Sequence, residues 1–165
     1  MAGKNIFPIP EVPLKFIRLF ATEKIPFVIV GGAAIALHGI PRGTLDIDIV
    51  VPAETETVNR LFSIIHEAGL LSRDRYITAV IGRPHLLIGQ WITLQDSSGM
   101  ELIDIFFESQ EEFNRLLKRA RKIKGMKFNF HIASLYDLEK MKKISARAID
   151  LADIVLIREK LGKKK

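Results

Sequence analysis

Residues 45–51, Leu-Asp-Ile-Asp-Ile-Val-Val, place two carboxylates inside a run of branched apolar residues. This composition predicts a β-strand, in which successive side chains point to opposite faces. Asp46 and Asp48 therefore share one face, and the apolar residues between them share the other. At about 7 Å between their Cα atoms, two bare carboxylates repel by about 2 kcal/mol at an effective dielectric near 20. The strand therefore predicts a sheet with a cation between the two acids.

Two kinds of cation fit this position. Arg42 is the only cationic residue close by in the sequence, so one guanidinium would have to serve both acids. The alternative is Mg²⁺ or Mn²⁺, which prefer hard oxygen ligands, keep several waters and share phosphate oxygens with a nucleotide. Two such ions about 3.5–4 Å apart support phosphoryl transfer in two-metal sites. We adopt the metal site as the working hypothesis.

Two further features support a phosphate-handling site. Asp104 lies between isoleucines in a second strand-like run, residues 100–107, so strand pairing can bring it beside the first two acids. Gly31 and Gly32 follow the predicted strand 27–30, where glycines let backbone N–H groups approach phosphate oxygens. A tight turn with no further role is the competing interpretation of the glycine pair. The GxGxxG and GK[ST] nucleotide-binding motifs are absent.

The remaining chain alternates between helical and strand-like patterns. A helix is predicted in 11–26, a short one in 33–38, and a third after Pro52 with Thr55 or Thr57 as its N-cap. Further along, the predicted elements are strands at 84–95 and 100–107 joined as a hairpin by Asp-Ser-Ser-Gly, a helix at 109–121, a strand at 127–133, and helices from an N-cap at Ser134.

Length and composition narrow the class of protein. The 165 residues are predicted to form one domain, 1–165, in which 134–162 is a helical C-terminal element. The absence of cysteine excludes disulfides, thiolate catalysis and cysteine-bound zinc. The net charge of +6, concentrated at 118–127 and near the C-terminus, suits an RNA or a nucleoside triphosphate as partner. No membrane span or secretory signal is predicted, which leaves the cytoplasm as the expected location.

The glycine pair, the Asp-x-Asp strand and the later single aspartate together resemble the DNA polymerase beta-like nucleotidyltransferase superfamily. Residues 30–51 resemble its small bacterial and archaeal members, which include the nucleotidyltransferase toxins of abortive-infection systems. The segment 137–154 resembles the family's C-terminal helical element, with Lys142, Arg147, Asp150 and Asp153 at matching places. The resemblance implies an α+β fold with a mixed, polymerase beta palm-like sheet, flanked by helices and followed by C-terminal helices.

The same resemblance implies roles for nine residues. Three acids would ligate the catalytic metals, with one of them also serving as a base for the acceptor hydroxyl, and six other residues would contact the nucleotide and its phosphates. The acids are Asp46, Asp48 and Asp104, the last being the base, and the nucleotide-binding residues are Gly31, Gly32, Arg42, Thr44, Lys142 and Arg147. Many family members have Gly-Ser where this chain has Gly31-Gly32, so one phosphate contact is missing here. Loop ordering by Arg42 and Thr44, and a solvated helix face with an Arg147–Asp150 pair, are the structural alternatives.

These observations predict a metal-dependent nucleotidyltransferase that moves a nucleoside monophosphate from an NTP such as ATP to a hydroxyl acceptor. The acceptor is left open between RNA or tRNA, a protein and a small molecule. Two other hypotheses stay open: a non-catalytic nucleotide- or RNA-binding module, and one component of a toxin–antitoxin pair. A chain of this length has little room for an acceptor domain, so a partner protein or a homodimer is also considered.

Overall fold

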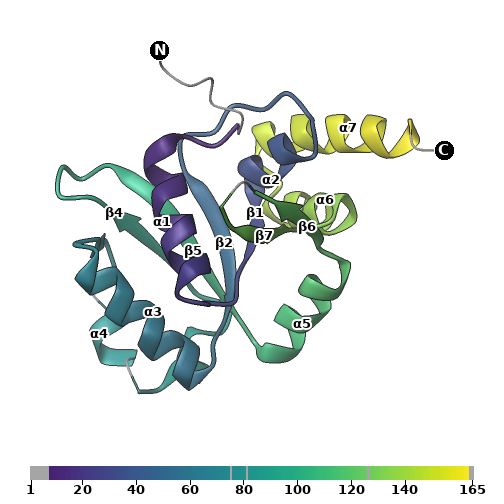
Figure 1. Ribbon diagram of the computed structural model, residues 1–165. Helices are drawn as coiled ribbons and strands as arrows, with labels where there is room; N and C mark the ends of the chain where they lie inside the picture. The colour runs from purple at the N-terminus through teal and green to yellow at the C-terminus, as the bar shows by residue number, and fades with distance from the viewer. Residues whose placement is uncertain (1–7, 75, 81, 126, 164–165) are drawn as a thin grey trace, which may run out of the picture.

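The computed structural model describes residues 8–163 except 75, 81 and 126. Helices alternate with strands along the chain (Figure 1). The strands are β1 (Val28–Val30), β2 (Ile47–Pro52), β3 (Leu71–Ser72), β4 (Trp91–Gln95), β5 (Glu101–Glu108), β6 (Arg121–Lys124) and β7 (Asn129–Ile132). The helices are α1 (Glu11–Thr22), α2 (Gly31–Leu37), α3 (Thr55–Glu67), α4 (Ile77–Val80), the 3₁₀ helix η1 (Pro84–Leu87), α5 (Gln110–Arg119), α6 (Leu135–Ser145) and α7 (Ala148–Gly162).

Within the described residues, the seven strands form one mixed sheet in the order β3-β4-β5-β2-β1-β7-β6. β2 runs parallel to β5 and antiparallel to β1, and β1 runs parallel to β7. β4 and β6 pair antiparallel with β5 and β7, and the edge strand β3 pairs antiparallel with β4. The expected α+β fold with a mixed sheet is thereby confirmed.

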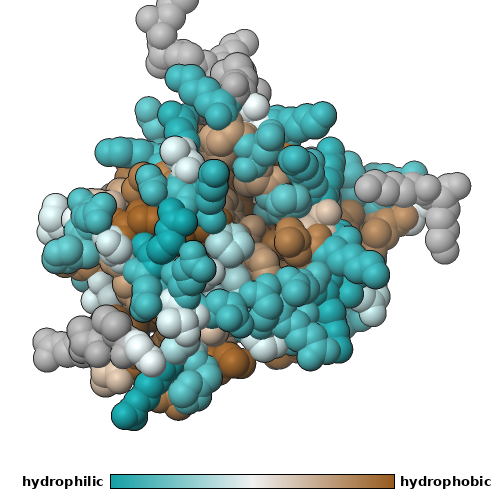
Figure 2. Space-filling model, turned by 60° about the horizontal axis from the view of Figure 1, so that its bottom comes forward, coloured by the Kyte–Doolittle hydropathy of each residue, from teal (hydrophilic) through white to brown (hydrophobic). Residues whose placement is uncertain are grey.

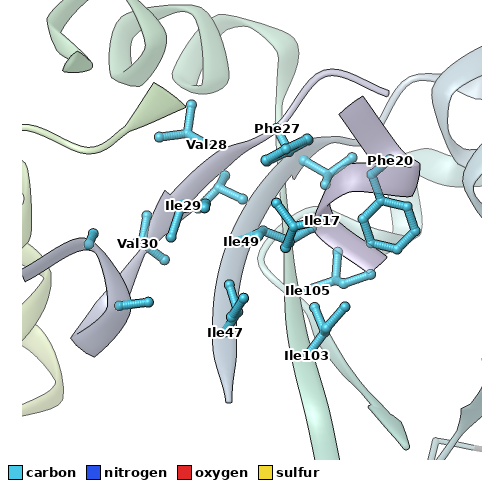
Figure 3. Close-up of a cluster of buried hydrophobic side chains, with 14 of the residues drawn as sticks. Ile17, Phe20, Phe27, Val28, Ile29, Val30, Ile47, Ile49, Ile103 and Ile105 are labelled. Atoms are coloured by element: carbon cyan, nitrogen blue, oxygen red, sulfur yellow. The ribbon is translucent and has the colours of Figure 1, made fainter. Parts of the chain in front are cut away.

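The core lies between helices α1 and α3 and one face of the central strands. In β2 and β5 the isoleucines at alternate positions point to this face, and Ile17 and Phe20 of α1 pack toward them (Figure 3). Phe62 of α3 stacks on Phe107 of β5 with ring centroids 6.5 Å apart. The residues between those isoleucines, including both strand aspartates, therefore lie on the opposite face. Figure 2 shows hydrophilic side chains over most of the surface in view, with apolar residues visible between them.

Most predicted elements are present, although β3, α4 and β6 were not predicted and the helix predicted for 11–26 ends at Thr22. Three further details differ. Residues 84–87, predicted as strand, form the 3₁₀ helix η1, because Pro84 at its start favours a turn over ladder pairing. The N-cap of α3 is Glu54, without a side-chain cap, and Thr55 is already helical, so the predicted threonine cap is wrong. α2 begins at Gly31 rather than at residue 33. The N-cap at Ser134 is confirmed, since its hydroxyl accepts the Asp137 N–H at 3.1 Å.

None of the helices in the described part of the chain is long and apolar enough to cross a membrane.

Candidate active site

Two of the three predicted acids, Asp48 and Asp104, lie side by side on the face of the sheet opposite α1. Asp48 of β2 and Asp104 of β5 are direct partners in the parallel ladder, so their side chains stand next to each other. Asp46 lies one residue before β2 and close enough to act electrostatically on both. The Thr93 hydroxyl of β4 donates to Asp104 Oδ1 at 2.6 Å and fixes the orientation of that carboxylate. The register of β2 and β5 is therefore what assembles the acidic group.

The acidic group is electrostatically strained. Burial, helped by repulsion from Asp46 and Asp104, raises the pKa of Asp48 to about 7. The cations of Lys142 and Arg147 act in the opposite direction without cancelling it. Burial likewise raises the pKa of Asp104, against the hydrogen bond from the Thr93 hydroxyl. Three carboxylates held this way would be stabilised by a cation among them.

Gly31 lies directly against Asp48 at the end of β1. Its φ of +64° is in the left-handed region, and a Cβ added to it would overlap Asp48 Oδ2 and lie 2.8 Å from Asp48 Cγ. Gly32 has no such restriction, because its nearest neighbours, in Arg42 and Thr44, would lie 3.6 Å from an added Cβ. The helix start at Gly31 follows from this packing, since only glycine lets the backbone turn into α2 so close to the carboxylate.

Arg42 and Thr44 belong to the loop between α2 and β2. Arg42 Nε donates to Asp153 Oδ1 of α7 at 3.0 Å, and Arg42 also donates to the Gly43 carbonyl. Among the described contacts, Arg42 therefore pairs with a carboxylate of α7 and not with one of the strand acids. Thr44 donates its hydroxyl to the Asp46 carbonyl at 2.8 Å, so it orders the loop that presents Asp46.

Lys142 and Arg147 are joined to two carboxylates of α7. Lys142 is only 7% exposed, with its ammonium 2.8 Å from Asp150 Oδ1 and 3.0 Å from Asp153 Oδ2, the latter as an ion pair without hydrogen-bond geometry. Arg147 Nε donates to Asp150 Oδ2 at 2.8 Å, and the Arg147 backbone N–H caps α7 on the same oxygen. The predicted Arg147–Asp150 pair is present, but Lys142 does not lie on a solvated face.

We call Arg42, Lys142, Arg147, Asp150 and Asp153 the α7 ion network. Asp150 is fully buried and Asp153 almost so, and together they face three cations, which leaves a formal charge of +1. The network connects the loop before β2, the end of α6 and the start of α7. The cations are thus held in place beside the acids of the sheet.

A cleft of about 340 Å³ lies between Asp48 of the sheet and α6. One wall comes from the sheet and carries Asp48, Val50 and Phe106, and the other comes from α6 and the start of α7. Gly31, Lys142 and Arg147 line the cleft, whereas Gly32 and Asp104 are not among its lining residues. A second hollow, of about 640 Å³, is lined by the loop 42–46 and Glu101. Of the nine predicted residues, four line the first hollow, three (Arg42, Thr44 and Asp46) line the second, and Gly32 and Asp104 line neither.

The residues of the site that were not predicted as functional include Thr93, Phe106 and Met141. Thr93 and Phe106 are placed by the registers of β4, β5 and β2, and Met141 by the position of α6 over the sheet. Only the alternation along residues 100–107, which puts Phe106 on the face of Asp104, could have indicated one of them. Asp150 and Asp153 were noted at matching positions, but their buried pairing with Lys142 had no local signal.

No group of three acidic or histidine side chains in the described ranges is gathered closely enough to hold a metal ion unaided. The donor set nevertheless suits a hard divalent cation, because it consists of carboxylate oxygens, and burial and repulsion raise the pKa of two of the groups, Asp48 and Asp104. Mg²⁺ is commonly bound by one or two carboxylates together with substrate phosphates and water, rather than by an all-protein cage.

The sequence profile of one protein family matches residues 15–160, which is most of the chain. The family is described as nucleotidyltransferase of unknown function (DUF6036). The chain belongs to this family. The predicted relation to nucleotidyltransferases of the polymerase beta-like superfamily is therefore confirmed, and the chain is classed as a transferase. No curated protein matches the sequence significantly.

Solved nucleotidyltransferases share the fold of this DUF6036 member at low sequence identity. The lincosamide antibiotic adenylyltransferase LnuA is 13% identical, with a TM-score of 0.63 over 91% of this chain and 97% of that one. A putative nucleotidyltransferase from Thermotoga maritima is 18% identical, with a TM-score of 0.57 over 97% and 99%. ANT(2")-Ia is 14% identical, with a TM-score of 0.58 over 93% and 89%. These likenesses support the fold.

Proposed function

We propose that this nucleotidyltransferase moves a nucleoside monophosphate from an NTP to a hydroxyl acceptor, with Mg²⁺ or Mn²⁺ as cofactor. The observation that carries the proposal is the pairing of Asp48 with Asp104 across β2 and β5, opposite the cations of Lys142 and Arg147. A metal-bound triphosphate requires carboxylates to hold the metal and cationic side chains to neutralise the phosphates, and the two groups face each other here across a cleft. The family membership gives the general reaction class, and the residue roles are part of the proposal.

In the proposed reaction, the acceptor oxygen forms a bond to the α-phosphorus while the bond from that phosphorus to the bridging oxygen breaks, and pyrophosphate leaves. Asp104 takes the hydroxyl proton, a role that its raised pKa favours. Lys142 and Arg147 bind phosphate oxygens, and the Gly31 backbone lets the triphosphate approach Asp48. Most of the rate enhancement then comes from positioning and charge neutralisation.

Asp46, Asp48 and Asp104 are the residues that would hold the divalent metal. Such an ion supplies charge neutralisation to the carboxylates and to the transferred phosphate. The absence of a ready-made three-ligand group in the described residues agrees with an ion whose remaining ligands are phosphate oxygens and water. Without the ion, the site holds the acids at a cost in stability, which is a common property of functional sites.

The neighbours in structure add support for the class of reaction. One is described as an adenylyltransferase bound to lincomycin, and another as a complex with adenylyl-2"-tobramycin. Transfer of an adenylyl group to a small hydroxyl-bearing molecule is therefore a chemistry that this fold accommodates. ATP is accordingly the first nucleotide to test in this protein.

The direct test uses α-³²P-labelled NTPs, Mg²⁺, and separate pools of RNA, protein and small metabolites. We expect a labelled product in one pool with the native protein and a loss of at least about 100-fold in Asp48→Asn and Asp104→Asn. Glu111→Gln, which removes a charge from an exposed ion pair on α5, is the matched control and should keep the native rate.

Folding must be checked in the same variants. Asp48→Asn removes a repelled, largely buried carboxylate, so its melting temperature without metal should equal or exceed the native value. Metal-dependent nucleotide binding by the native protein with no labelled product in any pool would support the non-catalytic binding module instead. If the Asp48→Asn protein is folded and still transfers label at the native rate, the assignment of the site is wrong.

A further inference from the structure

The positive net charge of the chain comes from one segment at the edge of the sheet. Residues 113–136, which span most of α5 and then β6 and β7, contain seven Lys and Arg residues and no Asp or Glu. The rest of the chain has 18 of the 25 basic residues and all 19 acidic ones, so its formal charge is −1 against +6 for the whole. The proposed transfer reaction uses none of the charge in this segment.

Most of these seven cations have no carboxylate partner. Arg115 pairs with Glu111 and Glu112, and Arg119 pairs with Asp137. The other five are exposed and form no ion pair within the described residues: Lys118, Arg121, Lys122, Lys124 and Lys127. Residue 126, which lies outside the described residues, is a methionine and adds no charge.

The strand β6 carries its charges on both faces of the sheet. It is the last strand in the sheet order, so its outer side has no neighbouring strand in the part of the chain that the structure describes. Lys122 and Lys124 point to one face, and Ile123, on the other, packs against the core. Burial, helped by the charge of Lys122, lowers the pKa of His131 on the paired strand β7. The electrostatic potential along this edge is therefore positive.

The basic surface continues from the β6–β7 hairpin onto α1 (Figure 1). The guanidinium of Arg18 lies over the ring of Phe128, with Cζ 5.7 Å from the ring centroid. Arg18 and Lys15 also line a hollow of about 360 Å³ on α1. We call Lys15, Arg18, Lys122, Lys124 and Phe128 the basic edge.

The acids nearest to this part of α1 lie at the two ends of the helix. Glu11 is in its first turn, and Glu23 follows its last residue and pairs with Arg60. Lysines on an edge strand can serve only to prevent pairing with another chain. That protection requires charge on the strand alone, whereas here cations without carboxylate partners, among the described contacts, extend across to α1.

Cations beside an aromatic ring suit single-stranded nucleic acid. Arg18 is exposed, so the outer plane of its guanidinium offers a stacking surface for a base, with Phe128 behind it. The flexible ammonium groups of Lys122 and Lys124 suit phosphates of the backbone. An acidic peptide would satisfy the ammonium groups equally well, but it would leave the stacking surface of Arg18 unused.

We propose that the basic edge is a binding surface for single-stranded RNA or DNA, separate from the cleft. None of its residues lines the cleft or the hollow beside Asp46, and β7 and β1 lie between β6 and β2. The cations bind successive phosphates, and one base stacks on Arg18. The nucleic acid is held here as a partner, so the inference does not rest on the proposed transfer reaction.

Fluorescence anisotropy with labelled single strands of about 12 nucleotides, a length within the usual site sizes, tests the proposal. We expect RNA or DNA of mixed sequence to bind, and the affinity to fall about 100-fold between about 50 and 200 mM salt, as contacts to about five phosphates require. A preference for one of the two identifies which nucleic acid is the partner. A duplex of the same length, a polyglutamate peptide and vesicles containing phosphatidylserine should bind at least about tenfold more weakly.

Two variants separate charge from stacking. Lys122→Gln/Lys124→Gln should lower the slope of log affinity against log salt by about 1.4, because two phosphate contacts are lost. Arg18→Lys keeps the charge but loses the planar group, so it should weaken binding at least about threefold with an unchanged slope. Arg73→Gln/Arg83→Gln removes two charges near the opposite edge of the sheet and should bind like the native protein.

Each variant is compared with the native protein by circular dichroism and melting temperature before binding is measured. The proposal is overturned if neither single strand binds at about 50 mM salt. It is also overturned if the control pair weakens binding as much as Lys122→Gln/Lys124→Gln does. Equal binding of the duplex, the peptide or the vesicles would show a surface for polyanions in general, which contradicts the assigned role of Arg18.

Discussion

At the scale of single residues, the backbone of Gly31 packs so closely against the carboxylate of Asp48 that no side chain fits between them. Its positive φ and its contact with Asp48 arise together, because the chain must turn from β1 into α2 beside an acid of the neighbouring strand. The adjacent Gly32 lies in ordinary van der Waals surroundings and within a helix. The two adjacent glycines therefore differ: both the backbone conformation and the close carboxylate require glycine at position 31, and neither requires it at position 32.

This difference gives a paired prediction. Gly31→Ala should lower the free energy of unfolding by about 2–4 kcal/mol, because a left-handed alanine is strained and its Cβ overlaps the Asp48 carboxylate. Gly32→Ala should leave it unchanged or raise it by up to about 1 kcal/mol, since alanine favours the helix. Urea unfolding of both variants measures the two values. Equal destabilisation in the pair would contradict the packing described around Gly31.

The acids of the site could be predicted from sequence because the alternation of charged and apolar residues is a local signal. Asp46, Asp48 and Asp104 each stand out against isoleucine neighbours. The partner of Arg42 could not be predicted, since Asp153 is 111 residues away in the sequence. Nothing near Arg42 distinguishes an arginine that pairs with the strand acids from one that is held by a distant helix.

At the scale of elements, α7 is the helix that holds the cations of the site. Its residue Asp150 accepts hydrogen bonds from Lys142, Ser145 and Arg147, and it is fully buried. The hydrogen bond from the Arg147 side chain, more than the bonds from Lys142 and Ser145, holds the pKa of Asp150 well below its usual range. α7 is thus attached to α6 through charge as well as through apolar packing.

A depressed carboxyl pKa stabilises the fold when the group is ionised in both the folded and unfolded states. That stabilisation is complete above the unfolded pKa, near 3.9, and is lost as the pH falls below it. Asp150→Asn should therefore cost about 3 kcal/mol at pH 7, because it leaves buried cations underpaired, and the difference from the native protein should shrink toward pH 3. Denaturant unfolding at several pH values measures this, with Glu111→Gln as the control.

A constant difference between the Asp150→Asn and native proteins from pH 7 to pH 3 would show that the charge of Asp150 does not carry the effect. The exposed Glu111 pair should contribute less than about 1 kcal/mol at any of these pH values.

The elements with clear end signals were predicted well. α6 begins after the Ser134 cap, and α5 begins after Ser109, whose hydroxyl accepts the Glu112 N–H. β6 was not predicted, because its sequence Arg-Lys-Ile-Lys is mostly charged, which is typical of a solvent-exposed basic segment rather than of a strand. Its strand conformation comes from pairing with β7, a tertiary effect that composition does not reveal.

At the scale of the whole molecule, the sheet is most deeply buried at its centre. β2 and β5 form the central parallel pair, whereas β3 and β6 are short or charged strands at the two edges. The strand order could not be read from the sequence, because β1 pairs with β7 across about 100 residues and no local pattern records that partnership. The hairpin of β4 and β5 and the pairing of the Asp104 strand with the Asp48 strand were predicted, and the rest of the strand order was not.

Native-state hydrogen exchange should follow this arrangement. Amides of β2 and β5 are expected to exchange only through global unfolding, and those of β6 through local opening, with protection lower by at least about 100-fold. Mass spectrometry of peptides from exchange time courses gives both values. Equal protection in β6 and β2 would mean that the sheet opens as a single cooperative unit.

The cleft gathers Gly31, Asp48 and Phe106 from the first two thirds of the chain, and Lys142 and Arg147 from its last part. During synthesis the acids of β2 and β5 can pair as soon as residue 108 has left the ribosome. The cations follow only with α6, and the carboxylates that hold them only with α7. A growing chain therefore carries the acidic half of its candidate site before the cations that face it, and the site becomes complete only when α7 has followed.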